Sequence, residues 1–277
     1  MNVPRVEVPM LIAQLSDPHL TTGALATEAA AGLHRALGRV LALTPRPDRV
    51  LISGDLTEHG SPEEYATLRE MITRYPLPVH LAAGNHDGRE AMIDAFGGTA
   101  CLGGGHDLHY VVEEPELTLV VLDSLTEGRP EWQRPGLAGC GRLGPEQLTW
   151  LDGVLARRSD VPAVVCVHHP PVAVGIPFMD GIRLRDGDAL AEVIGRHPHV
   201  VRVTTGHLHR ATTTAFAGTV LTTAPSTFRQ VSLAMHPDEQ LGWVAEPTAF
   251  LLHRLAGTHC VTHIVQVSHT SGVIGVF

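Results

Sequence analysis

The first third of the chain alternates short apolar runs with longer amphipathic stretches. Residues 10–15, 50–52 and 78–83 are almost continuously apolar, a pattern typical of strands that are buried on both faces of a sheet. Residues 27–43 repeat apolar side chains at helical spacing, and a second helix is predicted from Ser61, a good N-cap residue, to about residue 75. This strand–helix–strand–helix–strand order predicts parallel pairing with right-handed crossovers.

The remainder of the chain has a different pattern of apolar and polar positions. Short β-type runs dominate, and they cover residues 109–112, 117–122, 163–167, 200–204, 211–216, 219–223, 249–255 and 260–267. Helices are predicted at 144–157 and 186–196, and loops at 126–143 and 170–185. Residues 225–247 show no clear period. The pattern predicts an α/β (α+β) fold of two packed sheets flanked by helices, with the later strands in the second sheet.

One domain over residues 1–277 accounts for this pattern, with a core at about 10–225 and a C-terminal β extension at 226–277. Alternation at 263–267 predicts either a hairpin that joins the second sheet or an arm that pairs with another subunit. An exposed strand edge of this kind makes a homodimer possible.

Composition narrows the class of protein. The net charge is −9, with 29 acidic against 20 basic side chains, so binding to a nucleic-acid backbone is disfavoured. No run of 18 apolar residues predicts a membrane span, and residues 1–9 lack the apolar core of a signal peptide, so we expect a cytoplasmic protein. The four cysteines form no CxxC pair and are expected to be reduced thiols.

Metal-binding side chains follow five of the strand-like runs. The five clusters are Asp17-Pro18-His19, Gly54-Asp55, Gly84-Asn85-His86-Asp87, His168-His169-Pro170-Pro171 and Gly206-His207-Leu208-His209. Each cluster alone has an ordinary structural explanation, such as a turn, a helix cap or a buried histidine pair. Their shared position after a strand instead predicts that they meet at one sheet edge, where sites form in open α/β sheets.

The residue types suit a pair of divalent metal ions, which most often serve phosphoester hydrolysis. Residues two apart on an extended chain point the same way, so Asp17 and His19 can bind one ion together. His207-x-His209 repeats that geometry with two imidazoles. These mixed oxygen and nitrogen donors are typical of hydrolytic metal sites.

Two ions at about 3.5–4 Å repel one another, and a shared carboxylate reduces that repulsion. Asp55 is the natural bridge, and Asn85 offers a carbonyl oxygen to the second ion. We expect His86 to project toward the substrate, where it can protonate the leaving alkoxide. Asp87 is expected to orient that imidazole and hold it protonated.

The ordered set D-x-H, G-D, G-N-H-D, H-x-P and G-H-x-H resembles the calcineurin-like metallophosphoesterases over about residues 10–225. The D-x-H start, the His-His-Pro-Pro block and residues 179–184 resemble, more narrowly, bacterial class III cyclic-nucleotide phosphodiesterases and glycerophosphodiesterases. The resemblance implies a four-layer αββα sandwich of two mixed β-sheets flanked by helices, with a dinuclear metal site at the sheet edge.

The resemblance also implies two ligand sets. The first metal takes Asp17, His19, Asp55 and His209, and the second takes Asp55, Asn85, one of the paired histidines and His207. The H-x-P pattern aligns with His168, which leaves His169 as its support. His86 matches the catalytic histidine of the family, and the metals found in that family are iron, manganese and zinc.

We therefore expect a metal-dependent phosphoric diester hydrolase in which a metal-bridging hydroxide attacks small phosphodiesters such as cyclic nucleotides (cAMP) or glycerophosphodiesters. Alternatives within the same superfamily are a phosphomonoesterase and a nucleotide or protein phosphatase. A non-catalytic metal-binding scaffold would have lost ligands or the histidine at position 86, and a nuclease would need a basic surface.

Overall fold

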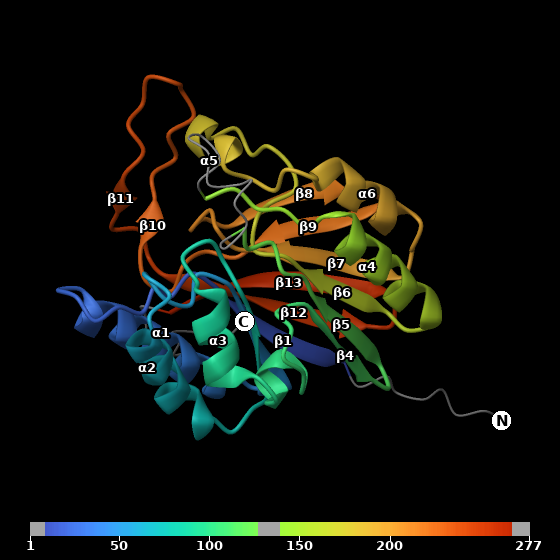
Figure 1. The fold of residues 1–277 in the computed structure, drawn as a ribbon, viewed down its shortest axis with the longest axis horizontal. Helices are drawn as coiled ribbons and strands as arrows, with labels where there is room; N and C mark the ends of the chain where they lie inside the picture. The colour runs from blue at the N-terminus through green and yellow to red at the C-terminus, as the bar shows by residue number, and fades with distance from the viewer. Residues whose placement is uncertain (1–8, 127–138, 268–277) are drawn as a thin grey trace, which may run out of the picture.

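The computed structural model describes residues 9–126 and 139–267, and it shows two β-sheets packed face to face between two layers of helices (Figure 1). Parts of two predicted segments, the N-terminal stretch 1–9 and the loop 126–143, lie outside the described residues, and so does the end of the C-terminal extension. The predicted four-layer αββα sandwich of two mixed sheets is confirmed.

The first sheet holds the N-terminal strands and the C-terminal hairpin. Strands β1 (Met10–Leu15), β2 (Arg49–Ser53) and β3 (Val79–Ala82) are parallel, as predicted. Strand β12 (Ala249–Ala256) runs antiparallel to β1, and β13 (His259–Gln266) forms the edge beyond it. The sheet order is β13-β12-β1-β2-β3.

The second sheet has six strands in the order β4-β5-β6-β7-β9-β8. Strands β5, β6, β7 and β9 are parallel neighbours, while β4 and β8 pair antiparallel at the two edges. Their bounds are β4 (Tyr110–Glu114), β5 (Leu117–Val121), β6 (Ala163–Cys166), β7 (Val200–Thr205), β8 (Thr212–Phe216) and β9 (Thr219–Thr223).

Helices cover the outer face of each sheet (Figure 1). Helices α1 (Ala26–Leu41), α2 (Pro62–Thr73) and α3 (Arg89–Phe96) pack on the first sheet, and they share one apolar core with both sheets. Helices α4 (Pro145–Arg157) and α6 (Gly187–Gly195) pack on the second sheet and form a separate core with it. Among the described residues, no helix combines the length and the apolar character that a membrane span requires.

The predicted position of the C-terminal hairpin is wrong. Strands β12 and β13 join the first sheet, because β12 hydrogen-bonds to β1. Buried Phe250 and Leu255 add to the core that the first sheet shares with α1–α3. Alternation indicates which face of a strand is buried, but it does not say which sheet the strand joins.

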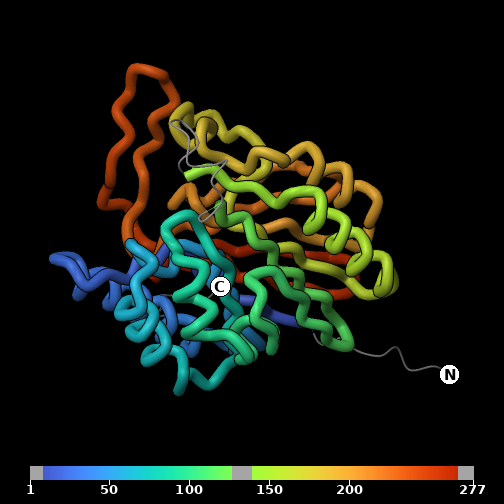
Figure 2. The backbone as a smooth tube through the Cα atoms, viewed as in Figure 1, coloured from blue at the N-terminus to red at the C-terminus, as the bar shows by residue number. Residues whose placement is uncertain are grey.

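Five short elements were not predicted. Helix α3 has only two buried residues and no side-chain cap, so it gives a weak periodic signal. The 3-10 turn at Ala100–Leu102 follows it, and α5 (Pro177–Gly181) is a single turn within the predicted loop 170–185. Strands β10 (Gln230–Val231) and β11 (Trp243–Val244) pair with each other, and the segment between them projects from one end of the sandwich beside α5 (Figures 1 and 2).

Candidate metal centre

The five clusters meet at the carboxyl ends of parallel strands. Three of them follow β1, β2 and β3 of the first sheet, and two follow β6 and β7 of the second. Because the two sheets are stacked, their carboxyl ends supply side chains to one place from both sides. Buried side chains that are separated by almost two hundred positions in the sequence therefore come into contact.

The first group contains Asp17, His19, Asp55 and His209. All four are buried, and one donor atom of each lies within 4.8 Å of the others. The Nε2 atoms of His19 and His209 are 3.0 Å apart, and His209 Nε2 lies 3.6 Å from Asp17 Oδ1. This grouping of two carboxylates and two imidazoles can hold a metal ion.

Each imidazole of this group has a partner at its Nδ1 atom, and this contact fixes the orientation of the ring. His19 Nδ1 lies 2.8 Å from Glu58 Oε2, and His209 Nδ1 donates to the Arg229 carbonyl at 2.7 Å. A proton on each Nδ1 leaves the Nε2 lone pairs directed at one another, an arrangement that favours a cation between them. Burial lowers the pKa of His19, but Glu58, Asp55 and Asp17 together raise it above its usual value.

The second group contains Asn85, His168 and His207, with Asp55 beside them. Asn85 Oδ1, His168 Nε2 and His207 Nε2 are all buried, and none has a hydrogen-bond partner within the described residues. Buried polar atoms are rarely left without a partner, because desolvation alone costs about 1–3 kcal/mol for each. The rings of His168 and His207 are 5.2 Å apart, and Asn85 lines the same pocket as His207. Three unpartnered atoms in this small region fit the donor set that a metal ion would satisfy.

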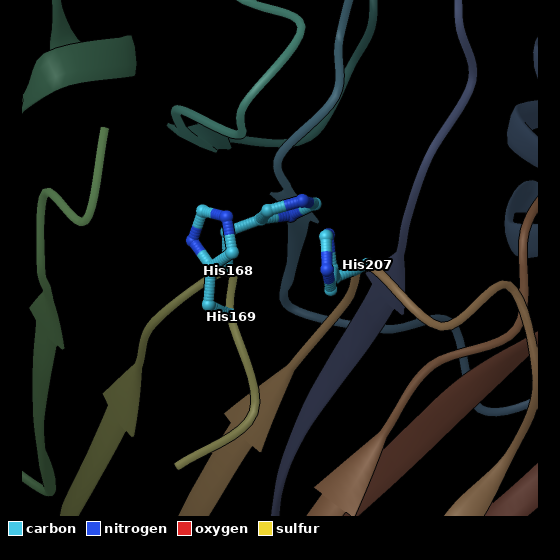
Figure 3. Close-up of side chains that lie close together, drawn as sticks. All are labelled: His168, His169 and His207. Atoms are coloured by element: carbon cyan, nitrogen blue, oxygen red, sulfur yellow. The ribbon is translucent and has the colours of Figure 1, made fainter. Parts of the chain in front are cut away.

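The paired histidines have different surroundings, although their rings lie close together with His207 (Figure 3). His169 Nε2 donates to the Gly139 carbonyl at 3.0 Å, and Nδ1 accepts from the Ser124 hydroxyl at 2.7 Å. Burial and the neighbouring His168 lower the pKa of His169 to about 3, so its ring is neutral with both nitrogens engaged. His168 uses only Nδ1, which donates to the Ser53 carbonyl at 2.8 Å.

Asp55 lies between the two groups. Its Oδ2 atom is 3.5 Å from His19 Nε2 and 3.4 Å from His168 Nε2, while Oδ1 accepts the backbone N–H of His86 at 2.9 Å. Burial opposes ionisation of Asp55, yet the charge of the neighbouring His168 holds its pKa well below the usual value. The carboxylate is therefore ionised and accessible to both groups.

The backbone at this edge is strained. Six described residues other than glycine have positive φ, and five of them are Asp17, His19, Asp55, His207 and His209. Such conformations cost of order 1–3 kcal/mol each and persist where the surroundings enforce them. The same tight geometry explains two glycines: a Cβ on Gly54 would lie 2.3 Å from His168 Nδ1, and one on Gly84 would lie 2.2 Å from Asp55 Oδ1.

A pocket of about 280 Å3 opens onto both groups. Its floor is formed by His86, whose side chain is 37% exposed, and by five of the donor residues: His19, Asp55, Asn85, His207 and His209. The rest of its lining comes from α5 and from the strand pair β10–β11, and it is almost entirely apolar. The pocket therefore joins a polar floor to a hydrophobic wall.

The calcineurin-like phosphoesterase family model matches residues 10–211 of this chain, a range that contains all five clusters. The chain belongs to the calcineurin-like phosphoesterase family. Among curated proteins of the family, it is 30% identical to a probable glycerophosphodiester phosphodiesterase GpdQ of Arcobacter nitrofigilis, with 88% of each chain covered. It is 33% identical to a probable cyclic nucleotide phosphodiesterase of a Synechococcus species, with 84% of this chain and 85% of the relative covered.

A third calcineurin-like relative is the 3′,5′-cyclic adenosine monophosphate phosphodiesterase CpdA of Pseudomonas aeruginosa, at 32% identity over 76% of this chain and 73% of that protein. The fold also resembles a solved dimetal phosphatase from Danio rerio. That likeness has a TM-score of 0.64 at 17% identity and covers 94% of this chain and all of the other. At this identity it shows the fold alone.

The predicted contact between Asp87 and His86 of this phosphoesterase is wrong. The buried Asp87 carboxylate accepts hydrogen bonds from the backbone of Leu56, Thr57 and Gly84, and also from the hydroxyls of Thr57 and Tyr65. These bonds fix the loops after β2 and β3. His86 Nδ1 instead donates to the Glu58 carbonyl at 3.0 Å.

Sequence reasoning missed Glu58 and the apolar wall. Glu58 lies three residues after Asp55, within the same turn, but one carboxylate in a loop gives no distinct signal. Trp243 and Phe178 lie in segments without periodicity, so only the structure brings them to the pocket.

Proposed function

We propose that this protein is a metal-dependent phosphodiesterase that binds two metal ions. The proposed first site is formed by Asp17, His19, Asp55 and His209, and the second by Asp55, Asn85, His168 and His207. The observation that carries the proposal is the position of Asp55 Oδ2, which is 3.4–3.5 Å from an imidazole nitrogen of each group. The unpartnered atoms of Asn85, His168 and His207 support the second site.

The reaction follows from the family and from the site. When bound, a metal pair supplies an activated water and positive charge toward the phosphate oxygens, and iron, manganese and zinc suit these oxygen and nitrogen donors. The chain itself supplies the fixed donors, and Glu58, Ser53 and Arg229 orient three of the imidazoles. Rigid positioning of this kind is the main contribution of a protein to phosphoryl transfer.

His86 is proposed as the catalytic residue. Its Nδ1 donates to the Glu58 carbonyl, which leaves Nε2 available to a substrate in the pocket. From there it can hydrogen-bond a phosphoryl oxygen or protonate the leaving oxygen. The part of Asp87 is to hold the loop that carries His86, not to contact its imidazole.

Small diesters fit this pocket better than monoesters. Among the described residues that line it, none is lysine or arginine. A phosphate monoester carries a second negative charge near neutral pH, and the described pocket wall offers no cationic side chain for it. The names of the relatives point the same way, because glycerophosphodiesters and cyclic nucleotides are both small diesters.

His86→Ala tests the proposal. We expect the variant to keep the metal content of the wild type while its turnover of bis-p-nitrophenyl phosphate falls by about 100-fold or more, the usual contribution of a general acid. Metal analysis of the same samples is the control. A near-normal rate in the variant, or faster hydrolysis of the monoester than of every diester by the wild type, would contradict it.

A further inference from the structure

Two large aromatic side chains are exposed at the mouth of the pocket. Trp243 on β11 is 58% exposed and Phe178 on α5 is 61% exposed. In the part of the chain that the structure describes, no other Trp, Phe or Tyr is exposed. Aromatic side chains gain most of their stabilising effect from burial, so two exposed ones at a single pocket indicate a surface that a ligand covers.

The apolar wall that carries these two side chains packs against the metal centre. A small apolar cluster joins Met179 of α5 to Leu208, and Ile182 and Leu241 pack against it. Leu208 stands between His207 and His209, so its packing ties the wall to two donor residues of the floor. The distance between wall and floor is therefore fixed by packing.

Trp243 is held beside the floor by several contacts. Its ring centroid lies 5.0 Å from that of His209. Strand β10 is tied down by Arg210, which donates to the Val231 carbonyl at 2.5 Å, and the same side chain pairs with Glu246 at 3.0 Å just beyond β11. The indole thus lies within reach of a group that is esterified to a phosphate on the floor.

We propose that the wall formed by Phe178, Met179, Ile182, Leu241 and Trp243 binds an ester group of the substrate and selects phosphodiesters that carry a flat aromatic group, such as a nucleobase. This inference rests on the proposed phosphodiesterase function. It separates two substrate classes that the relatives leave open, since a glycerol ester has hydroxyls but no aromatic face.

The polarity of the wall decides between these classes. Apart from the floor residues, the described lining has no side chain that can hydrogen-bond except the indole N–H of Trp243. The hydroxyls of a glycerol ester would lose water there without finding partners. A nucleobase or an aryl ring would stack on Trp243 and cover apolar surface, and stacking of this kind tolerates different bases.

The test compares Trp243→Ala with Trp243→Phe, using the manganese-loaded protein. A matched control is Ile264→Ala on the edge strand β13, because that side chain is also 58% exposed but does not line the pocket. Steady-state kinetics are measured with 3′,5′-cyclic AMP and with glycerophosphoglycerol, whose two ester groups carry hydroxyls but neither an aromatic ring nor a cation that could bind the face of Trp243. Light scattering on each variant reports the oligomeric state.

We expect the wild type to prefer cyclic AMP, and Trp243→Ala to lower kcat/KM for it by about 5- to 100-fold, mainly through KM. Trp243→Phe should restore most of this loss. For glycerophosphoglycerol both variants should stay within about twofold of the wild type, as should Ile264→Ala with either substrate.

Equal loss on both substrates, a wild-type preference for glycerophosphoglycerol, or a change of oligomeric state in Trp243→Ala would overturn the inference. In the last case the wall is a subunit contact. Failure of the proposed function looks different, because the wild type would then hydrolyse none of the diesters, including bis-p-nitrophenyl phosphate.

Discussion

The two adjacent histidines after β6 allow a matched test of the metal centre. His168→Ala and His169→Ala remove the same ring from neighbouring positions that are both fully buried. In the structure only His168 has a free ring nitrogen, because His169 is bonded to Ser124 and to Gly139. We expect His168→Ala to bind about one metal ion per chain and His169→Ala to keep both.

The expected stability changes are similar, so they do not confound the comparison. His169→Ala leaves the buried Ser124 hydroxyl without its partner, and His168→Ala does the same to the Ser53 carbonyl. An unsatisfied buried group costs about 1–3 kcal/mol, and the cavity adds to this, so each variant should lose about 3–5 kcal/mol in its free energy of unfolding.

The assay measures metal per chain after equilibration with manganese and gel filtration, with urea unfolding of the metal-free proteins alongside. Diesterase activity should follow the metal content: His168→Ala should lose most of it, and His169→Ala should keep much of it at temperatures where it stays folded. If His169→Ala lost an ion and His168→Ala kept both, the assignment drawn from the hydrogen bonds would be refuted.

Further predictions concern other parts of the molecule. Gly84→Ala should weaken manganese binding at least tenfold in dialysis, because its Cβ would displace Asp55, whereas Gly153→Ala in α4 meets nothing within 4 Å and should bind normally. Glu58→Ala should weaken binding by about 10- to 100-fold, and Glu58→Gln by less, since an amide oxygen still accepts the proton of the imidazole that Glu58 orients. Burial lowers the pKa of His253 to about 3. Below about pH 6.5 the unfolded chain binds a proton at this residue and the folded chain does not, so His253 alone lowers the free energy of unfolding by about 1.4 kcal/mol per pH unit as the pH drops toward 3. Other buried histidines such as His169 add to the total slope, so urea unfolding at about pH 5.5 and about pH 4.5 should show a steeper loss in the wild type than in His253→Gln, by about 1.4 kcal/mol per pH unit.

The polar clusters were predictable because each lies next to the strand that positions it. The carboxyl end of a parallel strand is a defined place, so Asp17 and Asp55 could be brought together from their shared position after neighbouring strands. His207 follows a strand of the other sheet and joins them because the two sheets are stacked. Asp87 was misassigned for the same local reason. Adjacency to His86 suggested contact, whereas the backbone turn directs the carboxylate toward the N–H groups of Leu56 and Gly84. The cytoplasmic location and the homodimer stay predictions.

The sheet to which the C-terminal hairpin belongs was beyond local reasoning, and so was the wall of the pocket. Strand β12 is a largely apolar run that would suit either sheet, and only its pairing with β1 decides the matter. The wall joins Met179 of α5 to Leu241, just before β11, through Leu208, and no spacing in the sequence indicates such a contact. The donor residues of this phosphoesterase, which lie at strand ends, could therefore be predicted from its sequence. The proposed substrate choice depends on Trp243 and Phe178, which lie in segments without hydrophobic periodicity. Substrate choice therefore has to be inferred from the structure.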